Sequence, residues 1–383
     1  MRLHNITIIN QLYSYFNLNY FFKKFSIQYL YCIHKYSTLA YIKKTVKLKT
    51  LTYIYLRGDL MRAIFIGILG ALFFSVTFIL NHAMASSGGN WLFSASLRFI
   101  FMFPFLFIFV YIKKRHRYIL EHIKKHFLQW LLWSTLGFVF FYIPITFVSN
   151  YSPGWLISAT WQLTIICGLL LAPLFYEYVQ LDKQLVKVRE RISWRSVSTS
   201  SVMVFGVVLV QIPQITSIEM QTFILSVVPL IIGAFSYPLG NRKMMELVDN
   251  ELTTIERIYG MTLVTLPIWV IIFVIGVFNS GFPSANQVLQ TFLVAVFSGI
   301  IATTLFFYAT NLVKNNQAKL AAVEATQATE IIFTLIGEML FLGLPLPDPI
   351  SIIGIIIITL GIFVYSFMNA KIRENNSELQ SFN

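Results

Sequence analysis

Apolar residues along this chain gather in ten long blocks that are separated by short polar connections. Most blocks approach about 20 residues, the length at which an α-helix crosses the hydrocarbon core of a bilayer, and they are too long for strands. The pattern therefore predicts an all-α membrane protein with ten transmembrane helices. The predicted spans are residues 63–84, 91–112, 127–148, 155–176, 197–212, 223–240, 258–279, 289–312, 320–342 and 349–368.

The composition argues against a soluble protein. Hydrophobic residues fill 57% of the 383 positions and charged residues 12%, whereas a soluble domain carries about 25% charged residues. The connections show no phosphate-binding glycine loop, no catalytic-triad spacing and no cluster of metal ligands. The two cysteines, Cys32 and Cys167, support neither a disulfide framework nor a metal site. We therefore expect a protein that is not an enzyme, with no catalytic residues, metal or cofactor.

The first 60 residues differ from the rest of the chain. They hold nine Lys and Arg against one acid, which is +8 of the total net charge of +13. They are also rich in Ile, Lys, Asn, Phe and Tyr, whose codons are AT-rich. Polar residues interrupt the longest uncharged stretch, so no span is predicted here. A targeting peptide is one interpretation, but transit peptides are rich in Ser and Arg. We favour a native start at Met61, with residues 1–60 a non-native or disordered extension.

Positive charge occurs in alternate connections. The loops after spans two, four, six and eight hold six, five, three and two Lys or Arg, the C-terminal tail holds two, and the other loops hold none. Because cytoplasmic loops carry the excess of Lys and Arg, both termini are predicted to lie in the cytoplasm. The run at 113–125 is also compatible with binding to nucleic acid or anionic lipid. The topology explanation needs fewer assumptions, and no nucleic-acid partner is expected.

The second half of the chain repeats the first at an offset of about 160 residues, a length typical of repeated structural units rather than of short motifs. Each unit has five spans, and this odd number means that the second enters the membrane upside down. We predict a first five-helix repeat at 61–212, a second at 223–370 and a cytoplasmic tail at 371–383. Inverted repeats recur in alternating-access transporters, whose substrate site lies near the midplane between the repeats. The ordered matches include Asn81 with Asn241, Arg98 with Arg257, Pro104 with Pro267, Thr160 with Thr326 and Glu177 with Glu338.

These features together resemble a known family. Each repeat has an Arg near the start of its second helix (Arg98, Arg257) and an acid near the end of its fourth (Glu177, Glu338), and the last helix contains Gly354 and Gly361. The pattern resembles the drug/metabolite transporter superfamily, and within it the ten-span putative multidrug-resistance efflux transporters of bacteria. The resemblance covers residues 61 to about 370 and implies a multi-pass exporter of the cytoplasmic membrane driven by a proton gradient.

One departure from that superfamily concerns the coupling residue. Its small four-helix multidrug members keep a carboxylate on their first helix, whereas span one here has Asn81 and His82 near its outer end and no acid. His82 is interpreted first as an interfacial residue, although its titration range would also suit a relay. For Glu177 and Glu338, structural roles at helix ends are favoured over substrate contact.

Span nine supplies a candidate replacement. A helical rise of about 1.5 Å per residue puts Glu330 near the midplane, where an acid is costly and usually marks a pathway. Thr326, Glu330 and Thr334 recur every four residues beside Gln327, which predicts one polar stripe on the helix. We therefore expect Glu330, Gln327, Thr326 and Thr334 to bind substrate or couple transport to protons. A buried acid satisfied by a neighbouring Thr or Arg is the structural alternative.

The repeat adds three further site candidates. At the 166 offset, Gln327 corresponds to Trp161 and Glu330 to Thr164, so span four brings an aromatic ring and a hydroxyl to the equivalent position. An aromatic wall with one carboxylate suits a lipophilic cation. Arg98 lies about two turns into span two and could line an anion path, although a structural ion pair is somewhat favoured.

The amino-acid sequence alone leaves three functions open. The first is proton-coupled efflux of drugs or lipophilic cations, with the bilayer, a small-molecule substrate and protons as the partners. The second is export of a metabolite or amino acid, which would rely more on paired charges such as Arg98 and Glu330. The third is a non-transporting scaffold or sensor, which is disfavoured because only thirteen residues follow position 370. The sequence defines no oligomeric state.

Overall fold

A computed structural model describes residues 42–181, 184–249, 251–313 and 317–381 of the chain. It divides into two compact units, Met1–Gly58 and Asp59–Asn383. The fold below is that of the second unit. Most of the predicted extension, residues 1–60, lies outside the described residues, so the structure does not test it.

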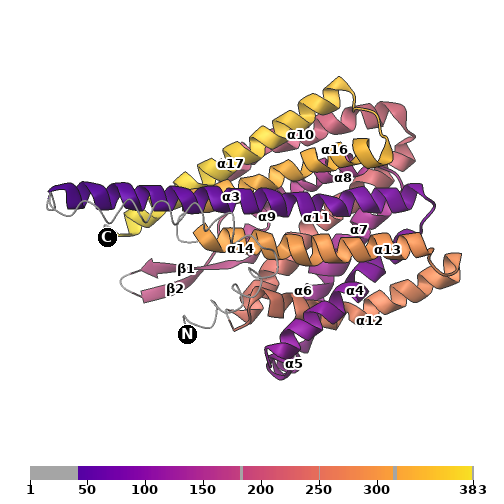
Figure 1. Cartoon of the computed structure of the whole chain (residues 1–383), viewed down its shortest axis with the longest axis horizontal. Coiled ribbons are helices and arrows are strands. Elements are labelled where there is room, and N and C mark those ends of the chain that lie inside the picture. Colours follow the sequence, from indigo (N-terminus) through magenta and orange to yellow (C-terminus); the bar gives the residue numbers. More distant parts are fainter. Residues whose placement is uncertain (1–41, 182–183, 250, 314–316, 382–383) are drawn as a thin grey trace, which may run out of the picture. The chain divides into compact units, whose positions relative to one another are not determined.

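Helices make up most of this unit (Figure 1). Those of its first half are the part of α3 Ile42–Ser86 from residue 59 onward, α4 Trp91–Ile112, α5 His116–Lys125, α6 Phe127–Ser134, η1 Thr135–Val139, α7 Phe140–Val148, α8 Gly154–Trp161, α9 Leu163–Leu170, η2 Ala172–Leu174 and α10 Trp194–Ser217. Those of its second half are α11 Met220–Val248, α12 Thr254–Ser280, α13 Ala285–Val294, η3 Ala295–Ala302, α14 Thr303–Val313, α15 Gln317–Glu324, η4 Ala325–Ala328, α16 Thr329–Leu342 and α17 Pro349–Ser381.

The membrane-spanning segments agree closely with the hydrophobic pattern. In the described part of the chain nine helical segments are long and apolar enough to cross a bilayer, and the shorter apolar stretch Gly154–Leu170 corresponds to the fourth predicted span. The described segments 91–112, 127–148 and 349–368 have the predicted bounds. Many large apolar side chains on these helices are exposed, among them Phe65 and Ile353, as expected for surfaces that face lipid.

The fourth predicted span, 155–176, is wrong at its end. The helix stops at Leu170, and a short 3₁₀ turn containing Pro173 follows. Proline lacks the amide hydrogen that a continuing helix needs, so the chain leaves the helix here. It then forms an antiparallel hairpin of β1 Tyr176–Leu181 and β2 Gln184–Arg189. Glu177, predicted near a helix end, therefore lies on a strand opposite Val188.

Two pairs of spans carry irregular turns at corresponding places. Span three contains the π-helical turn η1 and span eight the π-helical turn η3. Span four breaks at Gln162, between α8 and α9, and span nine changes to 3₁₀ geometry in η4. Such turns interrupt the helical hydrogen-bond ladder and are frequent at functional sites.

Helix pairs from the two halves of the unit pack against each other. Contacts join α4 with α12, α8 with α16, and α10 with α17, and Figure 1 shows α10 and α17 lying side by side. At the last crossing a Cβ on Gly206 would lie 2.9 Å from the Gly354 carbonyl oxygen, and a Cβ on Gly354 would lie 2.8 Å from that of Gly206. Two glycines are thus needed for this close approach.

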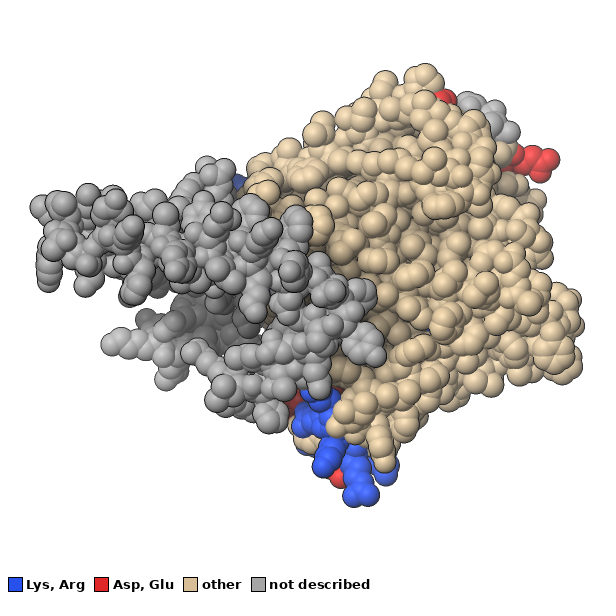
Figure 2. Space-filling view, in the orientation of Figure 1, with Lys and Arg blue, Asp and Glu red and all other residues tan. Residues whose placement is uncertain are grey.

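Aromatic rings fill the core between α4, α6, α7 and α12. Phe99 stacks on Trp269 with ring centroids 4.4 Å apart, and Trp130, Tyr142 and Tyr259 are fully buried nearby. A group of Lys and Arg side chains is visible instead at the edge formed by α5 (Figure 2). The visible surface of the described spans is almost entirely uncharged, which is the distribution expected of a protein embedded in lipid.

Candidate functional site

Glu330 lies in the first turn of α16, immediately after the 3₁₀ turn η4. It is 8% exposed. Among the described residues its carboxylate has no hydrogen-bond or ion-pair partner; only its backbone carbonyl is used, by the Thr334 hydroxyl at 2.8 Å. A carboxylate withdrawn from water without a partner is costly. It therefore requires an explanation beyond packing.

The predicted polar stripe around Glu330 is interrupted. Thr326 and Gln327 lie on the 3₁₀ turn, so the four-residue spacing does not continue along one α-helix. The hydroxyls of Thr326 and Thr334 donate to carbonyl oxygens of their own helix, at 2.6 Å to Val323 and 2.8 Å to Glu330. A Cβ on Gly67 would meet the Thr326 hydroxyl at 2.5 Å, so α3 packs directly against this turn.

An aromatic cluster, defined as Phe141, Trp161 and Tyr237, joins α7, α8 and α11. Its ring centroids are 4.7 to 5.6 Å apart. The structure thus places Trp161 against Tyr237 and Phe141, a set of contacts that the sequence analysis did not predict.

Thr164 follows this cluster along the chain, on α9. It is half-buried on α9, beyond the break at Gln162, and none of the hydrogen bonds among the described residues links its side chain to Glu330.

Arg98 is held by hydroxyl groups and a ring. Its guanidinium donates to Thr77 Oγ1 at 3.4 Å and to Ser298 Oγ at 3.2 Å. It also lies 4.2 Å from the centre of the Tyr142 ring, a distance typical of a cation–π contact. In the part of the chain that the structure describes, Arg98 forms no ion pair. No described acid therefore supports the structural ion pair that the sequence analysis favoured for this residue.

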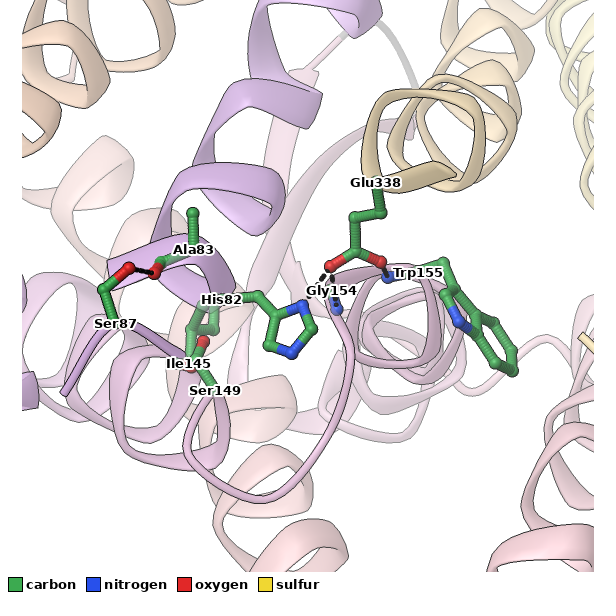
Figure 3. Close-up of polar contacts among 8 residues, drawn as sticks. All are labelled: His82, Ala83, Ser87, Ile145, Ser149, Gly154, Trp155 and Glu338. Atoms are coloured by element: carbon green, nitrogen blue, oxygen red, sulfur yellow. Dashed lines mark hydrogen bonds and ion pairs between the residues drawn. The ribbon is translucent and has the colours of Figure 1, made fainter. Parts of the chain in front are cut away.

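Glu338, two turns further along α16 than Glu330, has a different environment (Figure 3). It is fully buried. Its carboxylate contacts His82 Nδ1 at 2.6 Å and accepts hydrogen bonds from the backbone amides of Gly154 at 2.7 Å and Trp155 at 2.9 Å. These amides begin α8 and have no partner within that helix. Glu338 therefore caps the N-terminus of α8 and joins it to α3 and α16.

A small cavity adjoins this cap. It has a volume of about 210 Å³ and is lined by His82, by the end of α3 and by residues 149–153. His82 is 15% exposed at its side chain, whereas Glu338 is not exposed at all. The imidazole thus separates the carboxylate from the cavity.

A second set of polar contacts closes the opposite end, where α5 meets α12. Arg115 Nε donates to Glu256 at 2.8 Å, and Arg115 Nη2 donates to the Glu251 carbonyl oxygen at 3.0 Å. Glu256 also completes a capping box with Thr253 at the start of α12. Burial lowers the pKa of His122 on α5, and the Trp130 indole donates to its Nδ1 at 3.0 Å.

The described residues contain no group of three or more His, Cys, Asp or Glu that could hold a metal.

Comparison with known proteins agrees with this architecture. The family model described as "EmrE: Putative multidrug resistance efflux transporter" matches residues 61–371. The chain belongs to this family, which consists of membrane transporters and not of enzymes.

Two curated relatives are similar over most of their length. "Uncharacterized protein YjlA" of Bacillus subtilis (strain 168) is 48% identical over 307 residues, which are 80% of this chain and 95% of the relative. "Uncharacterized 42.1 kDa protein in intracellular alkaline protease 3'region" of Shouchella clausii is 47% identical over 286 residues, 74% of each chain. Neither description names a substrate.

Proposed function

We propose that this protein is a secondary active exporter of the cell membrane that exchanges a small molecule for protons. The observation that carries the proposal is the Glu330 carboxylate, which is buried in a spanning helix and has no described partner. A group in this situation can bind a proton or a cationic substrate, but not both together. Such competition is the simplest basis for antiport.

The architecture we propose is ten spanning helices in two inverted repeats, 61–212 and 223–370, with both termini in the cytoplasm and a tail at 371–383. Three observations support it. Lys and Arg alternate between connections, spans three and eight share π-helical turns, and spans four and nine share breaks. A reporter fused after Asn383 should be active only on the cytoplasmic side, and activity on the outer side would reject this orientation.

Drugs and lipophilic cations are the first candidate cargo. The aromatic cluster of Phe141, Trp161 and Tyr237 provides apolar ring faces, and a carboxylate together with such rings attracts an organic cation. Metabolites or amino acids are the second candidate. The observation that favours them is the presence of two buried arginines, Arg98 and Arg257, that form no ion pair with a described acid.

Proton movement coupled to cargo tests the proposal. The full chain is reconstituted in liposomes that contain a pH-sensitive dye, and a panel including tetraphenylphosphonium, amino acids and organic acids is added in turn. At least one cargo should move protons, and the Glu330→Gln protein should move none with it. If cargo crosses the membrane without moving protons, or if Glu330→Gln protein moves them at the wild-type rate, the proposed coupling is wrong.

A further inference from the structure

We propose that the exposed face of α5 binds the anionic head groups of phospholipids in the membrane around the protein. This helix, His116–Lys125, joins two segments that are long and apolar enough to cross a bilayer, 91–112 and 127–148. Only three residues precede α5 after the first segment, and one follows it before the second. Because so few residues span no more than about 10 Å, α5 lies at the membrane surface.

One face of α5 is used inside the protein. Ile119, His122 and Ile123 are buried, and helix geometry places positions three and four apart on the same side. Arg115, just before the helix, donates to Glu256 at 2.8 Å. These residues hold α5 against its neighbours α4, α6 and α12, so its other face has a fixed direction.

The opposite face is exposed and basic. A helix turns by about 100° per residue, so Arg117, Lys124 and Lys125 lie on the side of α5 away from Ile119. Five cations of α5 and of the turn before it are exposed, against one exposed acid, Glu121, which leaves a charge of five minus one, or +4. None of the five forms an ion pair with a described acid. The five cations are Lys113, Lys114, Arg117, Lys124 and Lys125.

Exposed apolar side chains border this basic surface at both ends. Tyr111 and Ile112, directly before the first two lysines, are 65% and 70% exposed. Phe127 and Leu128, just after the last two, are 52% and 77% exposed. These residues end or begin a spanning segment, so they meet acyl chains where the lysines reach head groups. A partner with an anionic head and an apolar tail fits both parts of the surface, whereas nucleic acid fits only the charges.

A role in membrane topology does not account for this arrangement. Lys and Arg orient a chain during insertion wherever they stand in a short loop, and an ordered helix with its cations on the outer face is not needed for that. Anionic membrane surfaces attract such basic segments by about 1 kcal/mol per cation, which is about fivefold in affinity. The same charges serve topology during insertion and lipid binding afterwards.

Short-chain lipids test the proposal on the purified full chain in a neutral detergent. Dioctanoyl phosphatidylglycerol is compared with dioctanoyl phosphatidylcholine, and the apparent Tm reports binding. We expect phosphatidylglycerol to raise the apparent Tm and phosphatidylcholine to raise it much less. The affinity should fall roughly tenfold or more between about 0.1 and about 1 M salt, because the Debye length shortens from about 10 to about 3 Å.

Matched pairs of substitutions locate the site. Lys124→Gln with Lys125→Gln removes two charges of α5, so the affinity for phosphatidylglycerol should fall about 25-fold, or about fivefold for each charge. Lys124→Arg with Lys125→Arg keeps the charges and should keep the affinity. Arg191→Gln with Arg195→Gln removes two exposed cations near the start of α10 and should leave the affinity unchanged.

Three results would overturn the proposal: equal shifts with the two lipids, a phosphatidylglycerol shift that survives high salt, or equal losses for the two Gln pairs. A matching shift with glycerol phosphate or with a short DNA duplex would also overturn it, because the surface would then bind phosphate or nucleic acid instead of lipid. The salt dependence is measured on the unaltered protein, so it decides the question even if the α5 variant folds poorly. No substrate or proton gradient is present, so the result is independent of the proposed exporter function.

Discussion

Two glutamates on one helix, Glu330 and Glu338, show why burial alone does not identify a functional acid. Both are withdrawn from solvent within the same two turns of α16. The Glu338 carboxylate has His82 and two backbone amides as partners, whereas that of Glu330 has none among the described residues. We interpret the first as part of the structure and the second as part of the transport cycle, because only the second is left to be satisfied by a proton or a ligand.

Removing each carboxylate in turn should give the largest difference between Glu330 and Glu338. Glu338→Ala leaves two amides and an imidazole without their acceptor, so we expect it to destabilise the protein by roughly 3 kcal/mol or more. Glu330→Ala should leave stability unchanged or slightly higher, since it removes an uncompensated buried group. The apparent Tm of each purified variant measures both effects. Equal losses would show that Glu330 is also held by the structure.

Gly154, at the start of α8, allows a second test of the role of Glu338 as a helix cap. A Cβ on Gly154 would lie 2.6 Å from the Phe78 carbonyl oxygen and 2.8 Å from Glu338 Oε1. Both contacts are shorter than packing allows, so Gly154→Ala must displace the start of α8 from its cap. We expect a loss of about 1–3 kcal/mol. Gly88→Ala is a control for the effect of replacing a glycine by alanine. A Cβ on Gly88 would meet no atom within 4 Å, although the φ of 77° at this position adds a small strain of its own. A smaller loss for Gly154→Ala than for the control would contradict the cap.

His82 supplies the third contact to Glu338 and should matter less. Without the imidazole the carboxylate still accepts hydrogen bonds from Gly154 and Trp155. We expect His82→Ala to cost about 1 kcal/mol, the typical value of one hydrogen bond. The apparent Tm should therefore lie between those of the wild type and Glu338→Ala. A loss as large as that of Glu338→Ala would mean that the imidazole, and not the α8 amides, holds the carboxylate.

His122 lies on α5, at the opposite end of the molecule from Glu338, and its titration should change the stability of the protein. Its pKa is lowered chiefly by burial, although Glu251 opposes the shift and His126 and Lys125 assist it. The unfolded chain takes up a proton at this residue below about pH 6.5, while the folded protein resists it. Acidification through that value should therefore lower stability. The fall in apparent Tm from pH 7.5 to 5.5 should be smaller in His122→Gln, and an unchanged fall would assign the effect elsewhere.

The sequence was sufficient for the spans but not for the partners of the buried groups. Apolar block length predicted segments such as 91–112 and 127–148 because the bilayer imposes that length on any helix. The end of 155–176 was missed because a proline such as Pro173 is compatible both with a kink inside a span and with the end of a helix. The contact of His82 with Glu338 spans 256 positions, and no local pattern encodes it. The isolation of Glu330 likewise became visible only in the folded chain, where none of the hydrogen bonds among the described residues reaches its carboxylate.

The most direct test of the central claim is the pH dependence of transport in proteoliposomes for two matched variants, Glu330→Gln and Glu338→Gln. Each keeps the side-chain shape and one acceptor oxygen but cannot titrate. We predict that Glu330→Gln abolishes gradient-driven transport and its pH dependence, while Glu338→Gln, in whatever fraction folds, keeps the wild-type pH profile. If Glu330→Gln protein transports at the wild-type rate with the wild-type profile, the Glu330 carboxylate is structural and the account is wrong.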